Sequence, residues 1–135
     1  MRSPIGVAAI AAALDLVSVL AFAASGRSSH QHGLTFAGIL QTAWPFLAAL
    51  AVMWILTLAV TRPTAPLRTG IPIWIGTVAL GMLLRVLFTD GEAPTAFVIV
   101  ASLVLGITLV GWRGLWTTFR RARRRSASGA DPATN

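Results

Sequence analysis

Four long apolar runs, separated by short polar segments that contain glycine and proline, constrain this chain more than any other feature. The runs occupy residues 5–24, 38–60, 71–88 and 95–112. Each approaches the roughly 20 residues that a helix needs to cross about 30 Å of hydrocarbon. Because backbone polar groups inside a bilayer must bond within their own segment, such runs are expected to form helices. The sequence therefore predicts an all-α, polytopic membrane protein, with a four-helix transmembrane bundle over residues 1–113 and a basic, partly disordered tail over 114–135.

The composition supports this class and excludes several chemistries. Only 11% of the residues are charged and the mean hydropathy is +0.76, whereas about a quarter of the residues of a typical soluble domain are charged. The chain contains no cysteine, lysine or tyrosine. Disulfides, thiolate or Schiff-base nucleophiles and a phenolic acid are therefore excluded.

The net charge of +7 comes from eleven arginines, and their positions predict an orientation. Five follow the last apolar run: Arg120, Arg121, Arg123, Arg124 and Arg125. The same side of the predicted spans holds Arg2, Arg62, Arg68 and Arg113. Arg27 and Arg85 lie toward the other side. Because arginine accumulates in cytoplasmic segments, both termini are predicted to be cytoplasmic. A basic block beside a span also predicts membrane lipids as partners, with anionic lipid at the tail, and not nucleic acid.

The first run has a second interpretation, as a cleaved signal peptide. Arg2, the apolar run and the small-residue pattern Ala21-Phe22-Ala23 resemble such a signal. The run is long for the apolar region of a signal peptide and contains Asp15, which favours a retained span. Cleavage would leave the orientation of the other three spans unchanged.

Asp15 lies about ten residues into the first run, near the predicted bilayer centre. An aspartate there costs roughly 2.5–3.5 kcal/mol on insertion scales, so it is expected to face protein or water. Arg85 is the predicted counter-charge, because the two residues differ in depth by only about 6 Å. The pair either fixes helix packing, or Asp15 is a titratable group in a proton- or cation-coupled pathway. A third interpretation has Arg85 extend alone to the outer membrane surface.

Other candidate positions carry weaker signals. Gly26, Arg27, His30 and His32 form a predicted polar cluster in the first outer loop. Two histidines without cysteine or carboxylate neighbours make a poor metal site, so no metal is expected. A solvated loop, an anion-facing cluster and a pH-sensitive patch remain open. Pro45 predicts a kink in the second helix. No catalytic or cofactor motif is present, so neither enzymatic activity nor a cofactor is expected.

Several polar, small and aromatic markers occur in an order typical of one family. They are Asp15, Phe22, Gly26-Arg27, His30, Pro45-Phe46, Gly70, Trp74, Gly81, Arg85, Ala96-Phe97 and Gly111-Trp112-Arg113. Over about Ala13–Arg113 the chain resembles a family of small four-span prokaryotic membrane proteins, found largely in actinobacteria and haloarchaea and catalogued as a domain of unknown function. The resemblance implies a multi-pass protein of a bacterial or archaeal inner membrane, and it supplies no catalytic residue.

Two main functional hypotheses follow. The first is a transport or channel-like protein in which Asp15 lines a water-accessible cavity. It is expected to work as a homo-oligomer, because four helices alone enclose little room for a pathway. The alternative is a non-catalytic accessory or assembly subunit of a larger membrane complex. It predicts an outward-facing stripe of small residues on the fourth span, such as Ala101, Ser102 and Gly106. A third interpretation is a lipid- or quinone-binding protein that uses the kinked second helix.

Overall fold

The computed structural model describes residues 4–28, 35–57, 59, 61–89 and 94–129. Its helices are α1 (Pro4–Ser28), α2 (Phe36–Leu56), α3 (Ile71–Phe88), α4 (Thr95–Leu105) and α5 (Gly111–Gly129), with π-helical turns η1 (Pro66–Gly70) before α3 and η2 (Gly106–Val110) before α5. The described residues include no strand, which confirms the predicted all-α class.

Four helical segments of the described chain are long and apolar enough to cross a membrane, which confirms the predicted four-span architecture. They are Ile5–Ser25, Phe36–Leu56, Pro66–Phe88 and Thr95–Gly129. α2 ends earlier than predicted, at Leu56, because Thr57 caps it with its backbone N–H and its hydroxyl. The third span begins earlier than predicted, because η1 leads directly into α3. Pro66 lies in the first turn of η1, where a missing N–H costs no helical hydrogen bond. Pro72 follows near the junction of η1 and α3.

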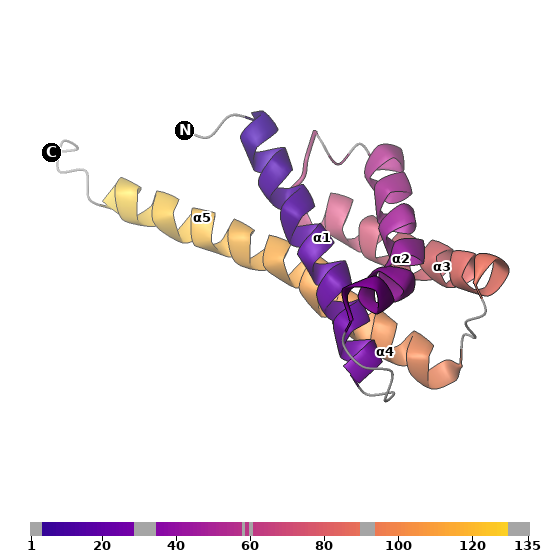
Figure 1. The fold of residues 1–135 in the computed structure, drawn as a ribbon. Helices are drawn as coiled ribbons and strands as arrows, with labels where there is room; N and C mark the ends of the chain where they lie inside the picture. Colours follow the sequence, from indigo (N-terminus) through magenta and orange to yellow (C-terminus); the bar gives the residue numbers. More distant parts are fainter. Residues whose placement is uncertain (1–3, 29–34, 58, 60, 90–93, 130–135) are drawn as a thin grey trace, which may run out of the picture.

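The fourth span belongs to the longest element of the molecule. α4, η2 and α5 form one rod over Thr95–Gly129 (Figure 1), which has 35 residues and is about 52 Å long at 1.5 Å per residue. A hydrocarbon core of about 30 Å covers little more than half of that length. The basic tail predicted over residues 114–135 is helical over 114–129, because arginine, alanine and leucine favour helix and no proline interrupts them. Residues 130–135 lie outside the described part of the chain.

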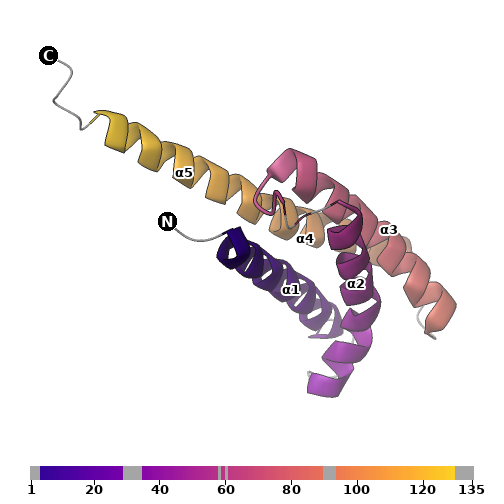
Figure 2. The ribbon, with the colours of Figure 1, turned by 90° about the horizontal axis from the view of Figure 1, so that it is seen from above.

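The helices pack around α2. Figure 2 shows α2 between α1 and α3, and α1 also contacts α4 and η2, while α3 contacts α4 and η2 from its own side. Phe22 of α1, Phe46 of α2 and Phe97 of α4 meet in the core, with ring centroids 5.2, 5.6 and 6.3 Å apart. Aromatic rings at such separations attract one another beyond their burial, so this triad joins three of the four spans.

α2 bends along its length (Figure 2), and it contains Pro45. Proline lacks the N–H of the helical ladder and its ring crowds the preceding turn, which accounts for such a bend. Pro45 is buried, and the neighbouring Phe46 ring fills the space beside Gly81 of α3. The bend therefore accompanies close contact between α2 and α3.

The small residues of the fourth span pack inside the chain. Ala101 is fully buried. Trp74 of α3 lies so close to Gly106 that a β-carbon there would be 2.7 Å from its indole ring, and its Nε1 donates to the carbonyl oxygen of Ser102 at 2.8 Å. The predicted outward-facing stripe is therefore wrong at these positions, because an indole from the same chain covers them.

Candidate functional site

A buried carboxylate–guanidinium pair lies where α1 meets the start of α5. The side chains of Asp15 and Arg113 are both 0% exposed, so of the two surroundings expected for Asp15, protein or water, the structure has protein. The two groups face each other with paired bonds: Nη1 of Arg113 donates to Oδ1 at 2.8 Å, and Nη2 donates to Oδ2 at 2.6 Å. Two parallel charge-assisted hydrogen bonds of this kind are among the strongest that side chains form.

Two indoles complete the hydrogen bonding of this carboxylate. Trp112 Nε1 donates to Oδ1 of Asp15, and Trp54 Nε1 donates to Oδ2, each at 2.8 Å. An ionised carboxylate offers about four lone-pair positions, and each oxygen of Asp15 accepts two hydrogen bonds. We call Asp15, Trp54, Trp112 and Arg113 the Asp15 cluster.

Arg113 also ties the cluster to the connection between α2 and α3. Its Nε donates to the carbonyl oxygen of Pro63 at 2.8 Å, and Nη1 donates to the carbonyl oxygen of Leu109 at 2.8 Å. The guanidinium carbon lies 4.5 Å from the centre of the Trp112 ring. Gly70 gives its side chain room, because a β-carbon there would be 3.1 Å from Cδ of Arg113. One side chain thus bonds to groups on α1, η2 and the α2–α3 connection.

The bonding of the cluster explains how two charges are tolerated in the interior. Removing a carboxylate or guanidinium from water costs several kcal/mol for each ion, and attraction offsets this only when the geometry is good and the remaining donors and acceptors are bonded. Here the attraction acts across paired bonds, and indole and carbonyl groups occupy further positions. Loss of one charged partner would leave the other buried and unpaired.

The predicted Asp15–Arg85 pair is corrected by the structure, which pairs Asp15 with Arg113. Arg85 lies in the last turn of α3, and its guanidinium carbon is 4.5 Å from the centre of the Phe97 ring of α4. Similar depth along α1 and α3 would bring Asp15 and Arg85 together only if these two helices were neighbours. α2 lies between them, whereas the η2 segment, one residue from Gly111 of α5, packs directly on α1.

Three members of the cluster do not follow from the sequence alone: Trp54, Trp112 and Arg113. The sequence does contain one usable signal, because Trp112 and Arg113 stand together at the end of an apolar run. An arginine at the end of a span can extend toward a carboxylate, but the packing of the helices decides which carboxylate it meets.

The remaining predicted positions are not brought to this cluster. Gly26 and Arg27 lie in the last turns of α1, where their side chains are outside the description, as are His30 and His32 entirely. The five arginines of the tail lie exposed on α5. Within the described ranges, no three histidine, aspartate or glutamate side chains gather as metal ligands do.

Comparison with known proteins places the chain in a family. A family model described as "Protein of unknown function (DUF3054)" matches residues 12–116. This segment includes every member of the Asp15 cluster, and it ends before the five arginines of the tail. A search of curated proteins and a search of solved structures returned no match. The chain therefore belongs to the DUF3054 family.

Proposed function

We propose that this protein is a non-catalytic accessory or assembly subunit of a membrane complex. The observation that carries the proposal is the bonding of Asp15. Each of its oxygens accepts two hydrogen bonds from buried donors of the same chain. A carboxylate that carries a proton or a cation across a membrane needs a free lone pair and access to water, whereas this one is used to hold helices together.

The outer surface of the bundle supports a role in contact with other membrane components. Only 17–28% of the most apolar window of each span is buried inside the chain. Leu103 and Ile107 of the fourth span and Leu83 of the third are more than half exposed. Such faces meet lipid tails or other helices, and they leave a large area on which a partner subunit can pack.

We place the start of α1 and the end of α5 in the cytoplasm, from the excess of arginine on that side. Four spans return the chain to the side from which it started, and both ends extend toward one side of the bundle in Figure 1. The resemblance to prokaryotic membrane proteins supports a bacterial or archaeal cell membrane as the location.

The transport hypothesis stays a prediction with a direct test. Purified protein in liposomes is assayed for solute-driven or ion-driven flux, with Asp15→Asn beside the wild type. An altered flux for an equal amount of folded protein would support transport and contradict the accessory role. The accessory role predicts no flux above that of protein-free liposomes for either protein.

The accessory role itself is tested by site-specific photo-crosslinking in native membranes. A photoreactive residue replaces Leu103, which is 59% exposed, and in a control replaces Leu105, which is 0% exposed. We expect crosslinks from position 103 to a different membrane protein, recovered at a constant ratio after mild-detergent purification, and none from position 105. A chain that purifies as a lone monomer or as a homo-oligomer would contradict the proposal.

A further inference from the structure

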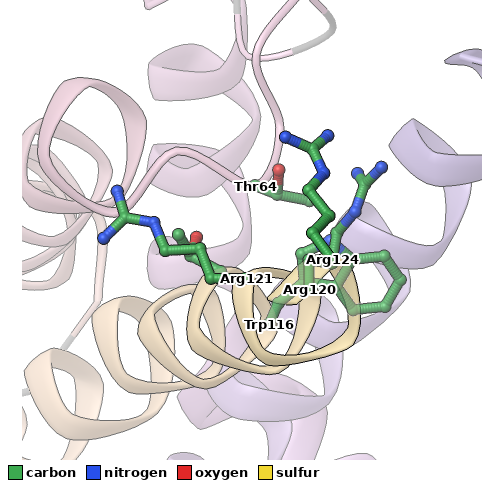
Figure 3. Close-up of a pocket in the computed structure, with 6 residues that line it drawn as sticks. Thr64, Trp116, Arg120, Arg121 and Arg124 are labelled. Carbon is green, nitrogen blue, oxygen red and sulfur yellow. The ribbon is translucent and has the colours of Figure 1, made fainter. Parts of the chain in front are cut away.

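A hollow lies beside α5 just past the fourth span. It has a volume of about 180 Å³ and is lined by Thr64, Trp116, Thr117, Arg120, Arg121 and Arg124. Figure 3 shows the three arginine side chains leaving α5 on the side on which Thr64, from the α2–α3 connection, lies. At about 30 Å³ per water the hollow has room for roughly six water molecules, which is enough for one phosphate group and its oxygens.

The charge of this hollow favours an anion. Positions 120, 121 and 124 share one face of a helix, because residues three and four apart are neighbours on its surface. Asp15 is the only carboxylate side chain in the described part of the sequence, and Arg113 holds it. The described residues therefore offer no counter-charge to these three guanidinium groups.

The neutral side chains of the hollow differ in what they offer a phosphate oxygen. Thr64 contributes a hydroxyl group, whereas the hydroxyl of Thr117 already donates to the carbonyl oxygen of Arg113 at 2.9 Å. Trp116 lines the hollow, but its indole N–H is buried and not open to it. Guanidinium groups bind phosphate through paired N–H donors, and the Thr64 hydroxyl extends the same donor set.

The position of the hollow along the rod fits a ligand at the membrane surface. About 20 residues of helix cross the hydrocarbon, so a span that begins at Thr95 reaches the boundary near Gly114. Trp116 and Arg124 then lie between roughly 3 and 15 Å beyond it along the helix axis. Phosphate groups of lipid headgroups lie at this level, and dissolved phosphate compounds reach it from the aqueous side.

We propose that the hollow between Thr64 and the Arg120–Arg121–Arg124 face of α5 is a binding site for a phosphate group. The site acts through the side chains that line the hollow and not through the total charge of the basic block. This inference does not rest on the accessory role, because it concerns a different part of the chain.

Two pairs of substitutions with equal loss of charge test the site. Arg121→Gln with Arg124→Gln removes two lining side chains. Arg123→Gln with Arg125→Gln removes two arginines of the same block that do not line the hollow. Both pairs change exposed side chains, so thermal unfolding is expected to stay the same and is measured as a folding control.

The full-length protein is probed in two arms. In the first, inorganic phosphate is titrated calorimetrically into protein held in phosphatidylcholine nanodiscs. In the second, native mass spectrometry measures phosphatidic acid retained by the protein against phosphatidylcholine. We expect saturable binding in at least one arm, a loss of affinity of at least tenfold for the lining pair, and a loss of less than threefold for the control pair.

Each outcome has a defined meaning. Binding in the lipid arm alone identifies a headgroup phosphate as the ligand, and binding in the phosphate arm identifies a free phosphate compound; both support the site. Equal losses for the two double variants would show that the basic block acts only through its total charge. That result, or the absence of saturable binding in both arms, overturns the proposal.

Discussion

At the scale of single residues, the Asp15 cluster determines how this protein holds charge in its interior. Arg113 bonds to the carboxylate and to two backbone carbonyl oxygens, and Trp54 and Trp112 bond to the same carboxylate from different helices. Hydrogen bonds to a charged group contribute more to stability than neutral ones. Since water is excluded from both ions, their free energy depends on the whole set of partners and not on one contact.

Asp15→Asn is expected to lower the free energy of unfolding by about 3–5 kcal/mol, because it leaves the buried guanidinium of Arg113 without a counter-charge. Unfolding by SDS in mixed micelles measures the change. Arg123→Gln, at an exposed position, serves as the control and is expected to stay within about 0.5 kcal/mol of the wild type. Combining Asp15→Asn with Arg113→Gln should cost less than the sum of the single losses. Additive losses would show that the two side chains do not depend on each other.

Trp54→Phe should lower the free energy of unfolding by about 1.5–3 kcal/mol, since it removes one charge-assisted hydrogen bond while keeping an aromatic ring. The matched control is Trp44→Phe in the same helix, at a side chain that is 40% exposed. The same SDS titration compares the two variants. A loss at Trp44 equal to that at Trp54 would mean that ring size, and not the bond to Asp15, is what matters.

At the scale of elements, glycines set how closely the helices approach. Gly106 of the long rod receives the Trp74 indole, and Gly81 of α3 receives the Phe46 ring. Small residues at such positions let helices gain van der Waals contact inside a membrane, where apolar burial alone provides little driving force. The helical rod over Thr95–Gly129 combines this packed segment with a basic segment that extends past the hydrocarbon.

Two glycine-to-alanine substitutions on the same rod are expected to change stability in opposite directions. Gly106→Ala should destabilise the protein by about 1–3 kcal/mol, because its β-carbon would overlap the Trp74 ring. Gly114→Ala meets no atom within 4 Å and should stabilise it by about 0.5–1 kcal/mol through higher helix propensity. Thermal unfolding in detergent measures the change in stability of each variant. Destabilisation by both variants would contradict the assigned packing.

At the scale of the whole molecule, a pair of single-cysteine variants tests the proposed orientation. The sequence contains no native cysteine, so only the introduced thiol can be labelled. Ser25→Cys, at the end of the first span, should react with a membrane-impermeant maleimide in intact cells. Ser128→Cys, near the end of α5, should react only after the membrane is permeabilised. The reverse labelling pattern would place the start of α1 and the end of α5 outside the cell.

The four spans follow from the sequence by itself, because hydrocarbon thickness and backbone hydrogen bonding act on each segment separately. The same local physics makes Asp15 an interior residue. The partner of Asp15 depends on which helices lie side by side. Only the tertiary structure therefore shows that this partner is Arg113 and not Arg85, and that Trp54 and Trp112 bond to the same carboxylate. Packing also turned the small residues of the fourth span inward against Trp74. Contacts between residues almost 100 positions apart, such as Asp15 and Arg113, are decided by the arrangement of the helices and leave no periodic signal in the chain.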